Sequence, residues 1–193
     1  AGRPTEGGRL ADGLGERGHG VGLTREPGGS PGAEEIRKLV LEGDPERWSP
    51  ETELLLFTAA RRDHLERLIL PALAAGQSVI CDRFADSTRV YQGLRGPDLR
   101  QKVDMLHDLM IVREPDLTVL VDMDPEVGLA RALGRQGTEE RFEQFGADLQ
   151  AQMRAGFLDL AQAAPKRYVV VDGARTEDTV AREIESIVTS RLT

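Results

Sequence analysis

The 193-residue chain has a single cysteine, no long apolar run and no excess of basic residues. That cysteine, Cys81, cannot form an internal disulfide, which is typical of proteins in a reducing cytosol. No apolar stretch approaches the ~20 residues that a membrane span needs, and the chain shows no charged and then apolar leader. We therefore expect a soluble, cytoplasmic protein without a membrane partner.

The net charge argues against a surface that coats nucleic acid. The chain carries a formal charge of −8 at pH 7, whereas nucleic-acid-binding domains normally show a basic stripe. A small anionic ligand is compatible with this charge, because a few neighbouring arginines can make one site positive although the chain as a whole is negative. The composition therefore predicts no nucleic-acid partner and leaves a small anionic ligand open.

Side chains that could act as nucleophiles or metal ligands mostly have a simpler interpretation. Cys81 ends an apolar run, which favours a buried structural thiol over a nucleophile. Asp124, followed by Pro125, has the sequence of a helix start, while Asp122 at a strand end is left open as a metal ligand. The histidines show no metal-ligand spacing, and we expect surface or structural roles for all of them: His19, His64 and His107.

Short apolar runs alternate with longer helical patterns along the chain. Each run is bounded by glycine, proline or aspartate, as expected of strands. The alternation predicts an α/β fold in one domain, residues 1–193, with a parallel sheet flanked by helices on both faces. The uninterrupted run at 117–121 predicts a strand buried on both faces. The predicted strands are 21–24, 78–81, 117–121 and 168–171, and the predicted helices are 8–17, 32–41, 50–75, 98–113, 125–133, 139–163 and 176–191.

The segment CDRFADSTRVYQG, residues 81–93, is the most informative. Ligands of open parallel sheets bind beyond the carboxyl ends of the strands, where its Asp-Arg pair would lie. Arg83 offers a planar guanidinium suited to a phosphate. Ser87 and Tyr91, four residues apart, share one helical face. The segment predicts a site for a phosphorylated ligand with a polar ring, formed by Asp82, Arg83, Ser87, Tyr91 and Gln92.

Two shorter motifs are individually weak. The sequence TREPGG at 24–29 is either a tight turn or a glycine-lined approach to a ligand. Phe57 and Arg61, four residues apart, place a ring and a guanidinium on one helical face. They are either a core phenylalanine with a solvated arginine, or a ring that stacks on a base whose carbonyl accepts from the arginine.

A glycine-containing loop at 131–142 carries several arginines. Charged runs usually do no more than solvate a face. A mobile basic loop can instead close as a lid over a polyphosphate and stabilise charge on the group in transfer. Both interpretations stay open from the residues alone, and they concern Arg131, Arg135 and Arg141.

Taken in order, these segments resemble the thymidylate kinase family of P-loop nucleoside monophosphate kinases. The set spans nearly the whole chain, and its order is highly specific although each motif is modest. The resemblance implies a three-layer P-loop fold that transfers the terminal phosphoryl of ATP to dTMP, giving dTDP for dTTP biosynthesis, with Mg²⁺ bridging the phosphates. The matching motifs are TREPGG (24–29), FTAAR (57–61), DRF (82–84), Ser87 with YQG (91–93), PDLT (115–118) and DPEVGL (124–129).

The resemblance also implies roles at the acceptor site. The phenylalanine matching Phe57 stacks on thymine, and the arginine matching Arg61 bonds a thymine carbonyl. Arg83 would hold the acceptor phosphate, and Tyr91 would crowd the 2′ position and so favour deoxyribose. Ser87 and Gln92 would meet the base. The expected substrate-binding residues are Glu26, Pro27, Phe57, Arg61, Arg83, Ser87, Tyr91 and Gln92.

On the ATP side the resemblance implies contacts from the chain start, the lid and the loop near residue 174. Asp82 would orient Mg²⁺ through phosphates or water. The expected ATP-binding residues are Gly2, Arg3, Thr5, Arg131, Arg135, Ala174 and Arg175. The expected catalytic residues are Asp82, Arg83, Arg131, Arg135 and Arg141. By the same likeness we expect a homodimer formed through helices beside the sheet.

The resemblance departs from the family at residues 1–5. The family opens with a strand and a phosphate loop, G-x-x-x-x-G-K-[ST], whose N–H groups cradle phosphates. Here Arg3 stands for the lysine and Pro4, which has no N–H, stands for the hydroxyl. We therefore expect the family's first strand to be missing from this chain. Either residues precede Ala1, which we favour, or the chain is an impaired dTMP-binding relative; a kinase for another nucleotide is a further alternative.

Overall fold

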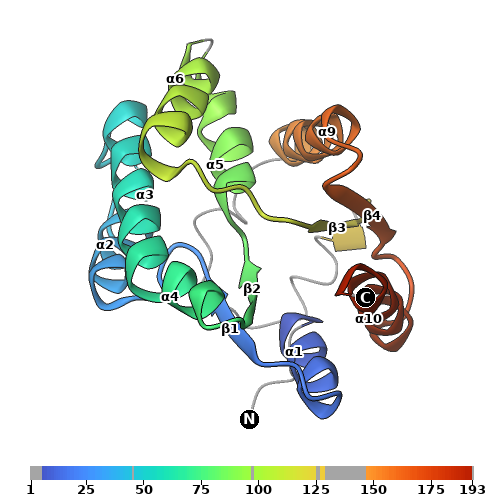
Figure 1. Ribbon diagram of the computed structural model, residues 1–193. Helices are drawn as coiled ribbons and strands as arrows, with labels where there is room; N and C mark the ends of the chain where they lie inside the picture. Colours follow the sequence, from blue (N-terminus) through green and yellow to red (C-terminus); the bar gives the residue numbers. More distant parts are fainter. Residues whose placement is uncertain (1–5, 45, 97, 125–126, 129–146, 193) are drawn as a thin grey trace. The chain divides into compact units, whose positions relative to one another are not determined.

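The computed structural model describes residues 6–44, 46–96, 98–124, 127–128 and 147–192 (Figure 1). The chain divides into two compact units, Ala1–Glu114 and Pro115–Thr193, which are treated separately below. No helix in these described ranges combines the length and apolar character that a membrane span requires.

The first unit alternates strands with helices, as the sequence pattern predicts. Its helical segments include two π-helical turns, η1 and η3, and a short 3-10 turn, η2. In chain order the elements are α1 (Glu6–Glu16), β1 (Val21–Arg25), α2 (Pro31–Leu41), α3 (Pro50–His64), η1 (Leu65–Ile69), α4 (Leu70–Ala74), β2 (Ser78–Asp82), α5 (Ala85–Tyr91), η2 (Gly93–Arg95), α6 (Leu99–Leu106) and η3 (His107–Ile111).

Strands β1 and β2 are parallel, with Val21 opposite Ser78 and Arg25 opposite Asp82. One further bond, from Glu26 N to the carbonyl of Asp82 at 2.9 Å, extends the pairing past the end of β1. Helix α1 packs against both strands and α4 against β2. Figure 1 shows α1 on one side of the pair and α4 on the other. Both strands therefore end at one edge with helices covering their faces.

The predicted helix at 50–75 forms as a nearly continuous segment, although it contains a proline. Proline has no N–H and clashes with the preceding turn inside an α-helix. The π-helical turn η1 lies directly before it, with Leu70 N donating to the carbonyl of Leu65. Pro71 then falls in the first turn of α4, where a missing N–H costs little.

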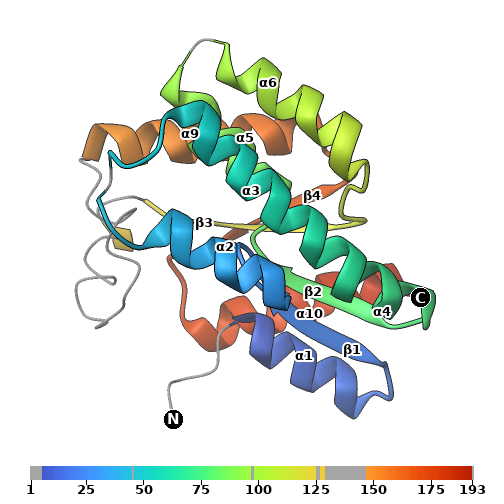
Figure 2. The ribbon, with the colours of Figure 1, turned by 90° about the vertical axis from the view of Figure 1, so that its left-hand side faces the viewer.

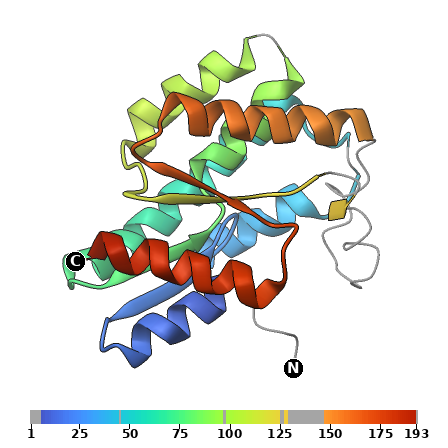
Figure 3. The ribbon, with the colours of Figure 1, turned by 90° about the vertical axis from the view of Figure 1, so that its right-hand side faces the viewer.

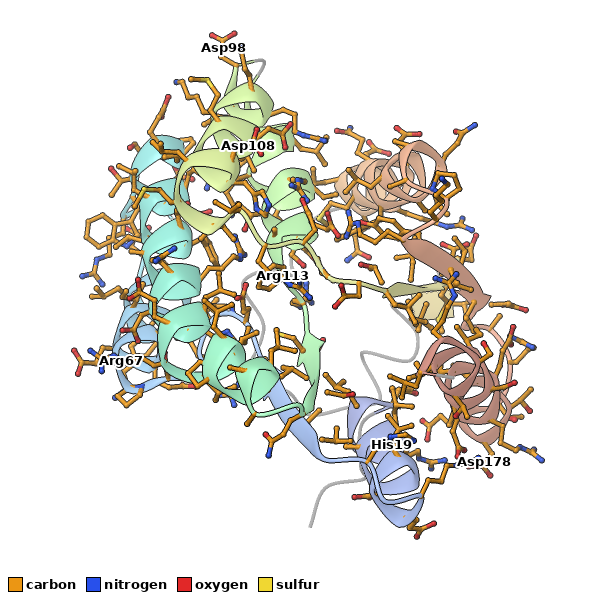
Figure 4. All side chains as sticks on the ribbon, viewed as in Figure 1. His19, Arg67, Asp98, Asp108, Arg113 and Asp178 are labelled. Atoms are coloured by element: carbon orange, nitrogen blue, oxygen red, sulfur yellow. The ribbon has the colours of Figure 1, made fainter. Side chains whose placement is uncertain are left out.

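Helix α3 is the main packing element of this unit. Ser49 caps its start by accepting a hydrogen bond from Thr52 N at 3.2 Å. Figure 2 shows α2 lying alongside it. Leu54 of α3 packs with the α6 side chains Leu99 and Val103, and each leucine buried in this way contributes about 2 kcal/mol of transfer free energy. Figure 4 shows Arg67 of η1 pointing outward from the first unit.

The second unit contains the parallel strands β3 (Thr118–Asp122) and β4 (Tyr168–Asp172), and the helices α9 (Ala147–Ala163) and α10 (Glu177–Leu192). Helix α9 contacts both strands and α10 contacts β4. Figure 3 shows the two helices on opposite sides of the strand pair. The predicted α/β pattern therefore holds in both units.

One burial prediction for this unit is wrong. The run at 117–121 was expected to be buried on both faces, but residues 117–120 are half-buried and Val121 is 42% exposed. Within the described ranges β3 has a single ladder partner, β4, so its other edge gains no cover from a neighbouring strand. The predicted helix at 125–133 and the start of that at 139–163 lie outside the described residues, apart from Val127 and Gly128.

Candidate active site

The candidate site lies at the edge where β1 and β2 end. Beyond β1 the chain forms a loop at 26–30, and beyond β2 it passes through Arg83 into α5. Helix α3 contributes Arg61 and His64 to the same region through contacts described next. Elements far apart in the sequence therefore meet at the carboxyl ends of the two strands, where α/β proteins bind ligands.

Glu26 is the centre of a buried hydrogen-bond network. Arg61 Nε donates to Glu26 Oε2 at 2.7 Å, and His64 Nδ1 lies 3.2 Å from Glu26 Oε1. Arg61 Nη2 also donates to Thr88 Oγ1 of α5 at 3.0 Å. The network is almost closed to solvent, since Glu26 is 6%, Arg61 5% and His64 0% exposed. A buried ion pair of this kind is costly to break, because removing one partner leaves the other charged and unpaired.

Arg83 combines an unusual backbone with an exposed side chain. Its φ of 67° lies in the left-handed region, which few residues other than glycine adopt. Arg83 Nη1 donates to Tyr91 Oη at 2.9 Å, and Arg83 Cζ lies 5.4 Å from the Tyr91 ring centroid. Backbone strain of this kind persists only where the surroundings impose it, and it gathers at functional sites. The strand end and α5 together thus aim this guanidinium outward.

The other predicted base-binding residues differ in exposure. Phe57 lies one turn before Arg61 on α3 and is buried, while Ser87 is half-buried. Gln92 is only 2% exposed, and its Nε2 donates to Glu53 Oε1 at 2.9 Å. The side-chain amide of Gln92 is therefore already hydrogen-bonded within the protein.

The loop at 26–30 is held from both neighbouring helices. Arg37 Nη1 of α2 donates to the carbonyl of Pro27 at 2.6 Å. Asp63 of α3 accepts from Ser30 Oγ at 2.6 Å and from Ala33 N at 3.2 Å, so it caps the start of α2. The Ser30 hydrogen bond is the main reason that the pKa of Asp63 is lowered. Gly28 and Gly29 have φ of 129° and 90°, so the predicted turn depends on glycine here.

A second buried arginine, Arg89, fastens α5 to the rest of the first unit. Arg89 Nη1 donates to Asp86 Oδ1 at 2.8 Å and to Glu114 Oε2 at 3.2 Å, and Arg89 Nε donates to Asp104 Oδ1 at 3.1 Å. His107 Nε2 lies 3.1 Å from Glu114 Oε1. Burial alone would raise the pKa of Glu114, but its interactions with His107 and Arg89 outweigh this effect and lower that pKa to about 2.

Two predictions about possible nucleophiles and ligands can be compared with this geometry. Burial raises the pKa of the Cys81 thiol well above its usual range, which keeps it protonated and supports a structural role. Cys81 is half-buried rather than buried. His64 is fully buried beside Glu26, a place that the sequence analysis missed. Its spacing of three residues from Arg61 puts both on one helical face, but does not indicate that this face meets Glu26.

In the second unit the acids at the strand ends are engaged by arginines. Arg154 Nε and Nη2 donate to the two oxygens of Asp122 at 2.7 and 2.8 Å. These bonds lower the pKa of Asp122 and engage both of its carboxylate oxygens. No group of three or more potential metal ligands is found in the described part of the chain. On the next loop Ala174 N donates to Asp172 Oδ1, and Arg175 Nη2 bonds Glu183.

Several predicted site residues lie outside the described ranges, and their roles stay predictions. They are Gly2, Arg3, Thr5, Arg131, Arg135 and Arg141.

Parallel strands that end together beside an exposed and a buried arginine suit a phosphorylated ligand, and such an arrangement is typical of α/β nucleotide-binding enzymes. Comparison with known proteins identifies the family. The family model for thymidylate kinase matches residues 1–184, and the chain belongs to the thymidylate kinase family.

Individual relatives agree with this assignment. The chain is 68% identical to a thymidylate kinase of Ruegeria pomeroyi over 192 residues, which cover 100% of this chain and 91% of the relative. It is 64% identical to a thymidylate kinase of Dinoroseobacter shibae, over 95% of this chain and 89% of the relative. The crystal structure of thymidylate kinase from Ehrlichia chaffeensis superposes with a TM-score of 0.73 at 33% identity, over 95% of this chain and 89% of that one. The resemblance noted from the sequence and the α/β kinase fold are thereby confirmed.

Proposed function

We propose that this chain is a thymidylate kinase that transfers the terminal phosphoryl of ATP to dTMP, giving dTDP. The observation that carries the proposal is its 68% identity, across the whole chain, with the thymidylate kinase of R. pomeroyi. The geometry at the ends of β1 and β2 supports it, because it provides one exposed and one buried guanidinium at the edge where such ligands bind.

At the acceptor site, Arg83 would hold the phosphate of dTMP. Its guanidinium is exposed and is oriented by Tyr91, which would also crowd the sugar. Phe57 would stack on thymine, and Arg61 would donate to a thymine carbonyl with an N–H not used by Glu26 or Thr88. Ser87 would reach the base more readily than Gln92, whose burial and bond to Glu53 favour a supporting role.

On the ATP side, Asp82 fits the expected role toward Mg²⁺. Magnesium keeps several waters and is usually held by one or two carboxylates together with phosphates. Asp82 is exposed at the end of β2 beside Arg83, so a single carboxylate faces solvent there. Bound Mg²⁺ would neutralise phosphate charge, while the chain's residues would position the acceptor for in-line attack. The remaining expected ATP contacts stay in the proposal. They are Gly2, Arg3, Thr5, Arg131, Arg135, Ala174 and Arg175, and Arg141 stays in it as a catalytic residue.

The proposal includes a cytoplasmic homodimer formed through helices beside the strands. Several large apolar side chains are well exposed on α3, α6 and η3 and at the residue directly after η3, and exposed apolar groups of this kind often mark interaction surfaces. They are Leu55, Met105, Leu109 and Val112. Sedimentation of the full-length protein would test this, and a Leu109→Glu variant would shift a dimer formed on this face toward monomer.

A coupled assay for ADP release tests the function. We expect turnover with dTMP, and slower turnover with dUMP, dCMP and thymidine. Calorimetry should show dTMP binding that is lost in Arg83→Ala. Binding of dTMP without any ADP release would instead indicate a dTMP-binding relative that lacks kinase activity. A faster rate with another nucleotide would reassign the acceptor.

A further inference from the structure

A buried chain of hydrogen bonds runs from β1 through two helices of the first unit. Thr24 Oγ1 lies 2.8 Å from His64 Nε2, and His64 Nδ1 lies 3.2 Å from Glu26 Oε1. Glu26 Oε2 accepts from Arg61 Nε at 2.7 Å. Arg61 Nη2 then donates to Thr88 Oγ1 at 3.0 Å.

The chemistry of the carboxylate fixes the direction of the bonds that Glu26 makes. An ionised carboxylate only accepts, so the proton between Glu26 and the imidazole belongs to His64 Nδ1. The other ring nitrogen, Nε2, is paired with the hydroxyl of Thr24, which can either donate or accept. One oxygen of the carboxylate is held by the cation Arg61, and the other by Nδ1 of His64. The histidine therefore contributes orientation to Glu26, and Arg61 contributes the opposing charge.

The loop after β1 is packed directly onto His64. A Cβ added to Gly29 would lie 2.3 Å from His64 Nε2 and 2.5 Å from Thr24 Oγ1. The order threonine, histidine and carboxylate resembles a nucleophilic triad. Here the Gly29 backbone fills the space beside the hydroxyl and His64 is fully buried, so no substrate carbonyl can reach Thr24. The arrangement is built to hold groups in place.

We propose that His64 is a positioning residue of the acceptor site, which acts through Glu26 to fix the guanidinium of Arg61. The proposal rests on the proposed function, in which Arg61 donates to a thymine carbonyl. Without the His64 donor, Glu26 Oε1 loses its buried partner and the carboxylate can rotate. Arg61 then keeps its charge but loses the single orientation that matches the base.

Two conservative variants separate the two bonds of His64. The amide nitrogen of asparagine superposes on Nδ1 of histidine, so His64→Asn keeps the donor to Glu26. The amide nitrogen of glutamine superposes on Nε2, so His64→Gln keeps the partner of Thr24 and loses the donor to Glu26. We expect His64→Gln to raise KM for dTMP on the order of tenfold, the ratio set by one hydrogen bond to a charged group. His64→Asn should change it much less, and KM for ATP should stay constant in both.

The coupling to Arg61 distinguishes positioning from a merely structural role. In an Arg61→Ala background, His64→Gln should cause no further rise in KM for dTMP, since residues that act through one another are not additive. His107→Asn is the matched control, because His107 is also buried in the first unit and faces a glutamate, Glu114, outside this network. It should alter thermal stability without altering KM for dTMP.

The proposal would be overturned if both His64 variants raised KM for dTMP and KM for ATP equally, and if these rises added to the effect of Arg61→Ala. It would also be overturned by a His64→Asn variant as impaired as His64→Gln. A readout independent of catalysis separates this failure from failure of the proposed function. The Nδ1 proton of His64 should give a downfield NMR signal that Glu26→Gln shifts and Arg61→Ala perturbs. If that NMR signal is present but dTMP is not a substrate, the hydrogen bond from His64 to Glu26 is confirmed and the proposed function fails. If the signal is absent, the hydrogen bond itself is wrong.

Discussion

The two strand pairs of this protein end in acids and arginines, but they neutralise their charges in different ways. At the end of β1, Glu26 and Arg61 are about 95% buried and are tied to two further elements through His64 and Thr88. At the end of β3, Asp122 meets Arg154 in a bidentate pair whose arginine side chain is 38% exposed. The first pair is linked to the protein core, and the second faces solvent.

This difference shows why similar residues at strand ends do not carry equal weight. Water screens an exposed pair and can replace either partner, so such pairs contribute little. A buried pair has no such substitute, and its geometry is fixed by every group around it. We therefore expect the end of the β1–β2 pair to respond sharply to substitution and the end of the β3–β4 pair to respond weakly.

Removing the buried arginine should have the largest effect on stability. Arg61→Ala leaves Glu26 charged and buried without its cation, which costs about 3–5 kcal/mol. Chemical denaturation followed by circular dichroism measures this change. Arg154→Ala is the matched variant in the second unit and should lower the free energy of unfolding far less. Similar losses in the two variants would mean that burial does not distinguish the two strand ends.

Alanine substitutions of Arg83 and Arg175 compare the two strand ends by their effects on enzyme activity. Arg83→Ala should lower kcat/KM for dTMP by roughly 10²–10³-fold, the usual loss when one charge-stabilising group is removed. Arg175→Ala should leave KM for dTMP unchanged and raise KM for ATP, because Arg175 lies on the loop after β4. Steady-state kinetics with each substrate varied in turn checks both. An Arg83→Ala enzyme with normal dTMP affinity would remove Arg83 from the acceptor site.

Much of this fold could be predicted from the sequence because its signals are local. All four described strands and most helices follow from apolar runs bounded by turn residues, and the position of Arg83 follows from the end of β2. Pro71 did not mislead the helix prediction, although the π-helical turn that accommodates it leaves no sequence signal. Local patterns therefore located the elements and the edge where the site forms.

The partners of the site residues were beyond such prediction, because they depend on long-range packing. Nothing near Glu26 in the sequence indicates that residues 61 and 64 approach it, and a histidine in a charged helix gives no sign of complete burial. The prediction that the run at 117–121 is buried on both faces was wrong for the same reason, because its burial depends on which strands lie beside it. Gln92 likewise offered no hint of its bond to Glu53.

Gly29 allows a smaller and sharper comparison within the first unit. Gly29→Ala introduces both an unfavourable φ of 90° and a Cβ 2.3 Å from His64 Nε2. Gly76→Ala introduces only the backbone cost, because its φ is 76° and nothing lies within 4 Å of the added Cβ. We expect about 1 kcal/mol of destabilisation for Gly76→Ala and about 2–3 kcal/mol for Gly29→Ala. Equal values by thermal unfolding would show that the loop at 26–30 can move away from His64.

Acid stability gives a further comparison, in which the two units again differ. The pKa of Glu114 falls from 4.5 to about 2 on folding, so this carboxylate stabilises the protein above pH 4.5 and loses that contribution as pH falls toward 2. Asp122 acts in the same direction, because Arg154 lowers its pKa below 3.8.

The difference in unfolding free energy between wild type and Glu114→Gln should therefore shrink between pH 4.5 and pH 2. The corresponding difference for Asp122→Asn should be smaller and shrink only below pH 3.8. Denaturation across this range would contradict the assignment if the Glu114→Gln difference stayed constant, because the interactions of Glu114 with Arg89 and His107 would then not depend on the ionised carboxylate.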